Sequence, residues 1–200
     1  MIDGKLIDTK INFAILASGA GSNADKICSY FKDHPHIQVN LIISNNINAG
    51  VLQVAASHGI ESIVIPKSSW ATPEIVLPDL RTKEITHIVL AGFLLLIPSW
   101  LVHEFKGHII NIHPALLPKY GGKGMYGHHV HEKVKLSGDV ISGITIHEVN
   151  EKYDEGDILF QKEINIDPED SADQIAAKVL EIEHYYYPRI IEQWVLGKNL

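Results

Sequence analysis

Residues 11–31, INFAILASGAGSNADKICSYF, read as a buried strand, a glycine loop and a helix. The strand at 11–17 is apolar at almost every position, which is typical of parallel strands that helices cover on both faces. In the segment that follows, apolar residues at 24, 27, 28 and 31 have the spacing of one helix face, and Ser22 or Asn23 is the expected N-cap. Strand, loop and helix in this order predict the first unit of a Rossmann-like layer.

Further alternation of strands and helices extends this layer. Apolar runs predict strands at 37–44, 62–66, 87–93 and 108–113. A helix over 49–58, between the first two of these strands, is expected to end at Gly59, a residue that suits a left-handed C-cap. Because strands that alternate with helices are joined by right-handed crossovers, we expect a parallel sheet.

The pattern changes in the second half of the chain. A helix near 126–136 precedes two long strands within 139–150 and 156–166, and the short connection between them predicts an antiparallel hairpin. A long helix is expected to begin at Ser171 and to bend near Pro188. We therefore predict an α/β fold with a mostly parallel, Rossmann-like sheet flanked by helices and an antiparallel C-terminal extension, in a single domain over residues 1–200.

Composition and charge narrow the class of protein. The chain has 200 residues, 46% hydrophobic and 20% charged, which is ordinary for a globular protein. Its formal net charge of −7 disfavours a nucleic-acid partner, since such partners favour basic surfaces. Cys28 is the one cysteine, so no internal disulfide can form. Residues 1–19 lack a basic segment followed by a long apolar stretch, and we expect a cytoplasmic protein without a membrane span.

The glycine loop at 18–23, SGAGSN, is the first candidate for a ligand site. Glycines let the backbone approach a ligand closely, and the N-terminus of the following helix offers N–H groups to an anion. The loop fits the dinucleotide fingerprint GxGxxG/A, but residues 44–46, SNN, stand where an acidic residue should hold a ribose. We therefore predict a phosphate site and no NAD site, with a tight turn that binds nothing as the alternative.

Asn111 and His113 are the second candidate, two residues apart at the end of the predicted strand 108–113. Residues i and i+2 of a strand point to the same face, so the amide and the imidazole can converge above the strand end. An amide N–H can stabilise an oxyanion, and an imidazole can do the same or transfer protons near neutral pH. The alternative is a polar strand end with no catalytic role.

Asp154 lies in the short turn between the two long strands, beside Gly156. As a solvated turn residue it would need no further explanation, because Asp and Gly are favoured in turns. The other hypothesis makes it the carboxylate that orients His113 and stabilises its cationic form. Local sequence does not decide between the two.

His128, His129 and His131, with Glu132, form a histidine-rich segment. The spacing differs from the HExxH zinc motif and no second ligand cluster accompanies it, so we predict no metal site. We expect these histidines at a helix start or in a loop near a polar cleft. Glu183 and His184 are expected as polar residues of an amphipathic helix.

Six segments together resemble the glycinamide ribonucleotide (phosphoribosylglycinamide) formyltransferase family. They occur in the family's order and are spread over nearly the whole chain. They read ILASGAGSN (15–23), ISNN (43–46), HIVLAGF (87–93), NIHPALLPKYGGKGMYGHHVHE (111–132), GITIHEVNEKYDEGDILFQ (143–161) and EHYYYPRII (183–191). The pairing of NIHPALLP with YDEGDILFQ at this distance is a highly specific signal. The resemblance implies the formyltransferase fold and a folate-dependent enzyme of purine biosynthesis.

The implied reaction moves the formyl group of 10-formyltetrahydrofolate, a cosubstrate, to the amine of glycinamide ribonucleotide, without a metal. By resemblance, Asn111 and His113 stabilise the negative oxygen of a tetrahedral intermediate, and Asp154 holds His113 and a water for proton transfer. We expect small-molecule substrates, no nucleic-acid or membrane partner, and a monomer or weak homodimer.

The resemblance also implies the substrate contacts. The phosphate of the ribonucleotide is assigned to Gly19, Ala20, Gly21, Ser22 and Asn23, and further contacts with that substrate to Pro114 and Glu183. The folate is assigned to Phe93, Leu94, Leu95, Leu96, Ile97, Asn111, Tyr153 and Asp154. Leu95 departs from the Arg of many relatives, so pterin recognition is expected to use backbone groups of 95–97 and the loop of Asp154. Leu180 departs likewise, because relatives often have Lys or Gln there.

Other functions stand beside this one. Sugar-nucleotide and other folate-dependent N-formyltransferases share the Asn, His and Asp. A methionyl-tRNA formyltransferase would need a further C-terminal domain, and a formyltetrahydrofolate deformylase a further N-terminal domain. From a different class, a non-catalytic nucleotide-binding module would bind a phosphate ligand without turnover.

Overall fold

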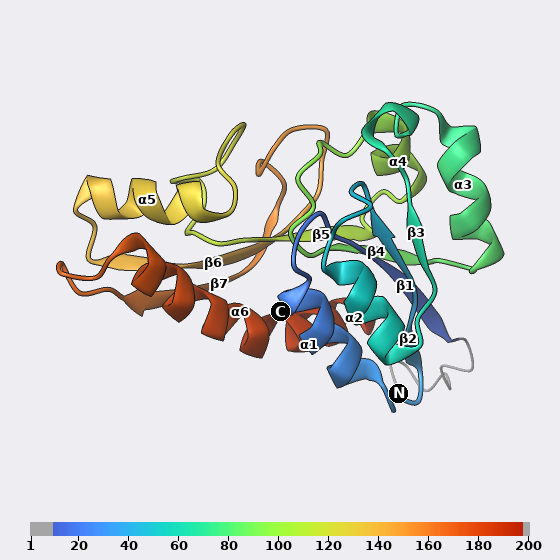
Figure 1. Cartoon of the computed structure of the whole chain (residues 1–200), viewed down its shortest axis with the longest axis horizontal. Coiled ribbons are helices and arrows are strands. Elements are labelled where there is room, and N and C mark those ends of the chain that lie inside the picture. Colours follow the sequence, from blue (N-terminus) through green and yellow to red (C-terminus); the bar gives the residue numbers. More distant parts are fainter. Residues whose placement is uncertain (1–9, 198–200) are drawn as a thin grey trace.

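Within residues 10–197, which the computed structural model describes, seven strands form one sheet (Figure 1). The strands are β1 (Ile11–Leu16), β2 (Ile37–Ser44), β3 (Ser62–Val64), β4 (His87–Leu90), β5 (Ile109–His113), β6 (Ile141–Glu148) and β7 (Ile158–Asn165). Their order is β3-β2-β1-β4-β5-β6-β7, parallel from β3 to β5 and antiparallel from β5 to β7. The predicted mostly parallel sheet with an antiparallel C-terminal extension is confirmed.

Helices cover both faces of this sheet. They are α1 (Ser22–Phe31), α2 (Val51–His58), α3 (Pro73–Thr82), α4 (Ser99–Glu104), α5 (His128–Ser137) and α6 (Ala172–Val195), with a short 3-10 helix, η1 (Lys67–Ser69), before α3. Figure 1 shows α5 beside β6 and β7 at the left of the view, and α3 and α4 at the right.

The side chains of β1 alternate between two hydrophobic clusters, because successive residues of a strand point to opposite faces. Phe13 and Ile15 pack with residues of α1, α2 and α6 on one face. Ala14 and Leu16 pack with residues of α3 and α4 on the other. The parallel strands therefore lie between two helical layers, and their carboxyl ends meet at one edge of the sheet, where α/β proteins bind ligands.

Helix α6 connects the C-terminal part of the chain to this edge. It begins with a capping box, in which Ser171 and Gln174 each accept a backbone N–H from the other. The helix continues through Pro188. The hydroxyl of the buried Tyr187 donates to the carbonyl oxygen of Leu90 at 2.8 Å. This bond ties α6 to the carboxyl end of β4.

Two local predictions at this edge are wrong. The N-cap of α1 is Gly21, with φ of +85°, and neither Ser22 nor Asn23 has that place. A Cβ at position 21 would lie 2.7 Å from Cα of Val51, so the close approach of α2 and the positive φ both require glycine. The strand expected over 87–93 ends at Leu90, and the residues after it leave the sheet.

No helix within residues 10–197 combines the length and the apolar character that a membrane span needs. The first nine residues, on which part of the expectation of a cytoplasmic protein rests, lie outside the described range. Cys28 is buried in α1.

Candidate active site

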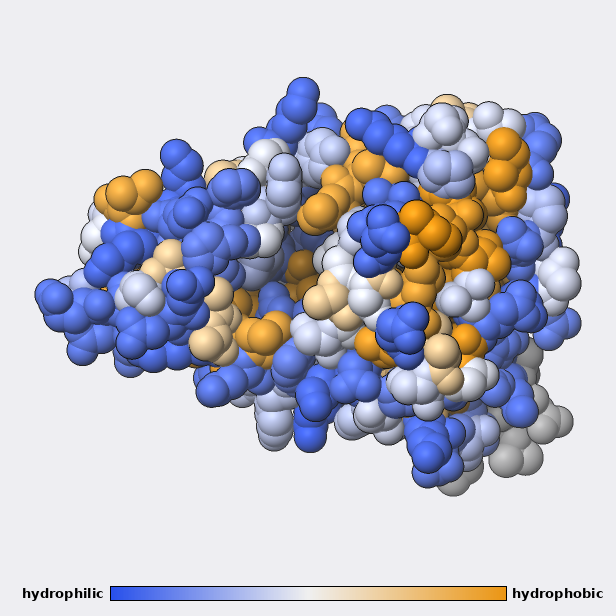
Figure 2. Space-filling view, viewed as in Figure 1, coloured by the Kyte–Doolittle hydropathy of each residue, from blue (hydrophilic) through white to orange (hydrophobic). Residues whose placement is uncertain are grey.

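A cleft of about 670 Å³ opens at the carboxyl ends of β4 and β5. Its walls come from residues 92–97 after β4, the end of β5, the glycine-rich loop 122–127, the loop between β6 and β7, and one face of α6. Figure 2 shows the molecular surface hollowed near the middle of the view, between α5 on the left and an apolar area on the right. The cleft therefore gathers segments from most of the chain around the strand ends.

Asn111 and His113 both line this cleft from the end of β5. Between them, Ile112 points to the opposite face and joins the hydrophobic cluster of α1 and α6. The alternation of the strand thus brings the amide and the imidazole to one side, as their spacing predicts. His113 is buried, with 3% of its surface exposed, whereas Asn111 is half-buried.

His113 has a different neighbour at each ring nitrogen. Its Nε2–H donates to the carbonyl oxygen of Tyr120 at 2.8 Å, because a carbonyl can only accept. Its Nδ1 lies 3.6 Å from Oδ2 of Asp154, an ion-pair distance that is longer than a hydrogen bond. Nδ1 is therefore the atom at which His113 can gain or release a proton, and it faces a carboxylate.

Asp154 is placed by the loop between β6 and β7. Its backbone has φ of +56°, and its Oδ2 accepts the backbone N–H of Gly122 at 2.9 Å. Its Oδ1 lies 3.6 Å from Nε2 of His147. Burial would raise the pKa of Asp154, but the His147 and His113 rings and the Gly122 N–H together hold this pKa below its usual range. The carboxylate is accordingly ionised at neutral pH.

Burial lowers the pKa of His113. The charge of Asp154 and the bond to Tyr120 oppose this effect, and the nearby His147 adds to it. A lowered pKa keeps the ring neutral in the free protein, so that His113 can accept a proton during a reaction.

His147, which the sequence analysis did not single out, completes this group. It lies directly opposite Asn111 in the register of β5 and β6, and its Nε2 accepts a hydrogen bond from Nδ2 of Asn111 at 3.1 Å. The available signal was the alternation in β6, where Thr145 and His147 are polar and Ile144 and Ile146 are apolar. A strand with that period presents both side chains to one face.

The glycine loop lies at the start of α1, where the first N–H groups of the helix face it. The carbonyl oxygen of Gly19 accepts the backbone N–H of Val51 at 3.1 Å, which fixes the loop against α2. Among residues 10–197, Asn23 is the member of this loop that lines the cleft, and the lining omits Gly19, Ala20, Gly21 and Ser22. The loop therefore borders the cleft through Asn23.

Glu183 of α6 joins the loop to the cleft. Its Oε2 accepts a hydrogen bond from Nδ2 of Asn23 at 2.7 Å, and 7% of its surface is exposed. Burial raises the pKa of Glu183 to about 7, although the bond from Asn23 favours the charged form. The structure thus brings together Glu183 and the glycine loop, which the resemblance assigns to the same substrate.

An apolar wall follows β4. It consists of Phe93, Leu94, Leu95, Leu96 and Ile97, all of which line the cleft. The backbone N–H of Leu94 donates to Oγ of Ser18 at 2.9 Å, and this hydroxyl donates to Oδ1 of Asn45. The other predicted folate contacts, Asn111, Tyr153 and Asp154, line the same cleft, as does Pro114. Every residue assigned to the folate therefore borders one cavity.

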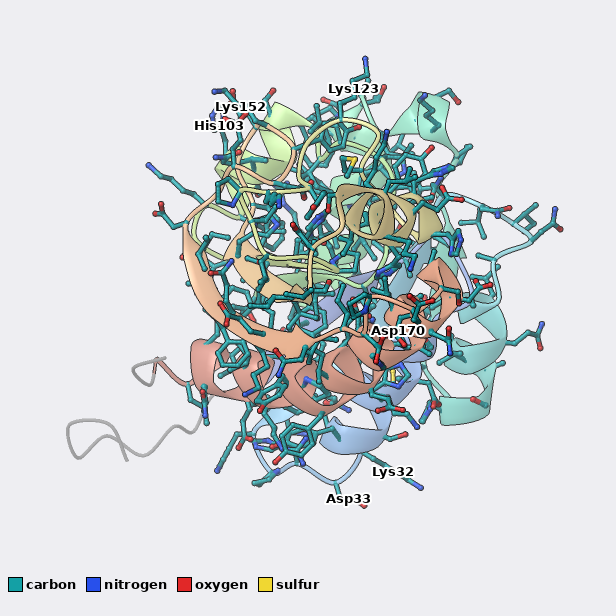
Figure 3. The ribbon with its side chains drawn as sticks, turned by 90° about the vertical axis from the view of Figure 1, so that its left-hand side faces the viewer. Lys32, Asp33, His103, Lys123, Lys152 and Asp170 are labelled. Atoms are coloured by element: carbon teal, nitrogen blue, oxygen red, sulfur yellow. The ribbon has the colours of Figure 1, made fainter. Side chains whose placement is uncertain are left out.

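The cleft has lysines in its lining as well as the carboxyl groups of Asp154 and Glu183. Lys123 and Lys152 both line it, and Figure 3 shows these two lysines at the same end of the molecule, with His103 close to Lys152 in the view. Lys152 pairs with Glu155 at 2.9 Å. In a chain of net charge −7, lysines at a cleft favour anionic ligands there.

The histidine-rich segment forms the start of α5. His129 and Glu132 pair at 2.9 Å on the outer surface, while His128 and His131 line the cleft, as expected of histidines near a polar site. Burial lowers the pKa of His131 to about 4, with the neighbouring His128 and His113 adding to the effect. Across residues 10–197, no group of three or more His, Cys, Asp and Glu side chains is arranged to hold a metal ion.

Several proteins of known name are similar to this chain in sequence. A phosphoribosylglycinamide formyltransferase of Bacillus subtilis (strain 168) is 35% identical over 192 residues, which are 94% of this chain and 95% of that protein. A chloroplastic phosphoribosylglycinamide formyltransferase of Vigna unguiculata is 40% identical over 184 residues, 90% of this chain. This chain spans 59% of the length of that plant relative.

A solved structure and a family model that match this chain are also of formyltransferases. The crystal structure of phosphoribosylglycinamide formyltransferase from Brucella melitensis superposes with a TM-score of 0.84 at 30% identity and covers 96% of this chain and 99% of that one. The family model described as Formyl transferase matches residues 11–191, from the first strand to the last helix. The chain therefore belongs to the formyl transferase family.

Proposed function

We propose that the chain transfers the formyl group of 10-formyltetrahydrofolate to the amine of glycinamide ribonucleotide, giving N-formylglycinamide ribonucleotide and tetrahydrofolate in de novo purine biosynthesis. The observation that carries the proposal is the arrangement of one cleft. Asn111, His113 and Asp154 line the same cleft as an apolar wall, residues 93–97, and as Glu183, which bonds Asn23 of the glycine loop. These parts suit a reacting centre, a flat folate and a phosphorylated acceptor.

The chemistry needs stabilisation of a negative oxygen and movement of one proton. The amine nitrogen bonds to the formyl carbon, the carbonyl oxygen becomes negative, and the bond from that carbon to N10 of the folate then breaks. One proton leaves the attacking amine, and one reaches N10 as it departs. Donors to an oxygen of this kind are typically worth about 3–4 kcal/mol of barrier each.

Asn111 and His113 are proposed to stabilise that oxygen in different ways. Nδ2 of Asn111 has two hydrogens, of which one is bonded to His147, so the second remains for the oxygen. Both nitrogens of His113 already face protein groups, namely Tyr120 and Asp154. His113 would therefore act through the positive charge that it acquires when Nδ1 takes up a proton.

Asp154 is proposed to stabilise this cation and to help return the proton to the leaving N10. Its lowered pKa supports the role, since the carboxylate is charged when His113 accepts the proton. The N–H of Gly122 holds the same carboxylate in place. A water held by Asp154 is proposed to complete the proton path. No metal enters these steps, which rest on position and charge.

The substrates are proposed to bind on opposite sides of this centre. The ribonucleotide phosphate is assigned to the glycine loop at the start of α1, and Glu183 and Pro114 to other parts of that substrate. The pterin is assigned to the wall 93–97 and to the loop of Tyr153 and Asp154. Since Leu95 has no donor on its side chain, recognition there would use backbone groups.

The setting of the enzyme is part of the proposal. We infer one catalytic domain over residues 1–200, acting on small molecules in the cytoplasm as a monomer or weak homodimer, without a nucleic-acid or membrane partner. The Vigna unguiculata relative is named as chloroplastic, so cell fractionation is the measurement that tests the compartment.

One assay tests the reaction. The protein is incubated with 10-formyltetrahydrofolate and glycinamide ribonucleotide, and release of tetrahydrofolate is followed. Formylation of the ribonucleotide is the expected result. Release without any amine would instead identify a deformylase, and release only with a sugar-nucleotide amine would identify a sugar-nucleotide formyltransferase. Binding of the ribonucleotide with no release would identify a binding module.

A further inference from the structure

We propose that His147 is a positioning residue, which holds the amide group of Asn111 so that an N–H of Asn111 faces the oxygen that becomes negative. The inference deepens the proposed formyl transfer and rests on it. His147 itself is not assigned a contact with the substrate's reacting atoms. Its role is to fix the orientation of the Asn111 amide, so that Nδ2 and not Oδ1 faces the His147 ring.

The first step is the register of the sheet. Asn111 of β5 and His147 of β6 are directly opposite in an antiparallel pair. Side chains of opposite residues lie on the same face of a sheet, close enough to interact. His147 is buried, with 2% of its surface exposed, so its ring has one environment. The amide and the imidazole are therefore held together by the backbone of two paired strands.

The second step fixes the proton on His147. Its Nδ1 lies 2.7 Å from the carbonyl oxygen of Glu148, and because a carbonyl only accepts, Nδ1 carries the hydrogen. In the neutral ring, Nε2 then has a lone pair and can only accept. The same carbonyl lies against the backbone of Gly156, where a Cβ would be 1.7 Å from it, so this position requires glycine.

The third step follows for Asn111. The amide group 3.1 Å from Nε2 must present Nδ2–H, because Oδ1 in that place would set two acceptors against each other. Oδ1 of Asp154 lies 3.6 Å from Nε2, which is longer than a hydrogen bond, so Asn111 is the hydrogen-bond partner of this nitrogen. The chain of bonds runs from the Glu148 carbonyl through His147 to Asn111, and it leaves the second hydrogen of Nδ2 for the cleft.

Two substitutions separate this role from simple packing. The terminal amide of Gln reaches about as far as Nε2 of histidine, and that of Asn about as far as Nδ1. His147→Gln therefore retains an acceptor for Asn111, whereas His147→Asn retains only the donor to Glu148. We expect His147→Asn to lower kcat about a hundredfold with little change in KM, and His147→Gln to lose less than about tenfold. His36→Asn, at an exposed position outside the cleft lining, is the control.

A double-mutant cycle tests whether the effect passes through Asn111. In an Asn111→Ala background, His147→Asn should lower kcat by less than about threefold, because the group to be positioned is absent. Equal losses for the Gln and Asn variants would overturn the inference. So would a loss from His147→Asn that is as large without Asn111 as with it.

A measurement without turnover keeps this inference distinct from the proposed function. Nitrogen-15 NMR of the histidine rings should show His147 protonated at Nδ1 and bare at Nε2, and hydrogen exchange of the Asn111 side-chain amide should be slow. His147→Asn should speed that exchange, and His147→Gln should not. A wild-type protein that shows these signals but forms no product would contradict the formyl transfer alone. A ring protonated at Nε2 would contradict the positioning role whatever the activity.

Discussion

Nδ1 of His113 and Oδ2 of Asp154 lie 3.6 Å apart, in a site where both side chains are almost completely withdrawn from water. Burial lowers the pKa of the imidazole, and the charge of the carboxylate opposes this effect without cancelling it. The two residues come from the end of β5 and from the loop between β6 and β7. They are far apart in the sequence, and the fold brings them together. Changes to either one should be visible at the other.

Replacing Asp154 by Asn removes the charge and keeps the shape. The carboxylate raises the pKa of His113, so the pKa of His113 should fall further in Asp154→Asn. We expect kcat to drop by about a hundredfold or more, because the cation that forms on His113 loses its partner. Proton NMR titration of His113 and steady-state kinetics measure the two effects. An unchanged His113 titration would contradict the ion pair.

Replacing His113 by Ala should lower kcat by roughly a hundredfold or more, since the group that becomes positive beside the oxygen is lost. The matched control is His108→Ala, which removes an exposed histidine just before the other end of β5, outside the lining of the cleft. Initial rates with both substrates saturating provide the comparison. Near-normal turnover in His113→Ala would remove the catalytic assignment.

Part of this site follows from local sequence rules. The two-residue spacing of Asn111 and His113 predicts a shared face, and the structure places both on the cleft. The mostly parallel sheet and its antiparallel extension follow from runs of apolar residues and from a short connection. These features depend on neighbours along the chain, where periodicity has physical meaning.

The rest depends on contacts that sequence spacing does not encode. His147 meets Asn111 because of the register of β5 with β6, and a shift of one residue would turn His147 to the other face. Glu183 has the pattern of a polar residue on an amphipathic helix, yet it is buried, because α6 packs against the start of α1. Helices α3 and α4 were not predicted from the sequence. Helix α4 has six residues, too few for a helical period to be recognised.

The raised pKa of Glu183 predicts a pH-dependent stability. A carboxyl with a pKa of about 7 in the folded chain and about 4.5 in the unfolded chain favours folding fully below pH 4.5. This contribution is lost as the pH rises towards 7, because the unfolded chain releases the proton more readily. Glu183→Gln keeps an acceptor for Asn23 and cannot ionise, so it should gain up to about 3 kcal/mol over the wild type between pH 5 and pH 8. Urea unfolding of both proteins at pH 5 and pH 8 measures the difference in their free energies of unfolding. A difference that is the same at both pH values would contradict a raised pKa of the buried Glu183 carboxyl.

Replacing Gly156 by Ala tests the turn that holds Asp154. A Cβ at this position would lie 1.7 Å from the carbonyl oxygen of Glu148, so the backbone of the turn must move. We expect a loss of at least about 2 kcal/mol in the free energy of unfolding. We also expect kcat to fall, because Asp154 shifts together with the Glu148 carbonyl that accepts the hydrogen bond from His147. Gly19→Ala is the matched control, since a Cβ there meets nothing within 4 Å. Its stability should be unchanged, and a higher KM for the ribonucleotide would support the role of the loop. A Gly156→Ala protein as stable and active as the wild type would show that the turn does not fix the site.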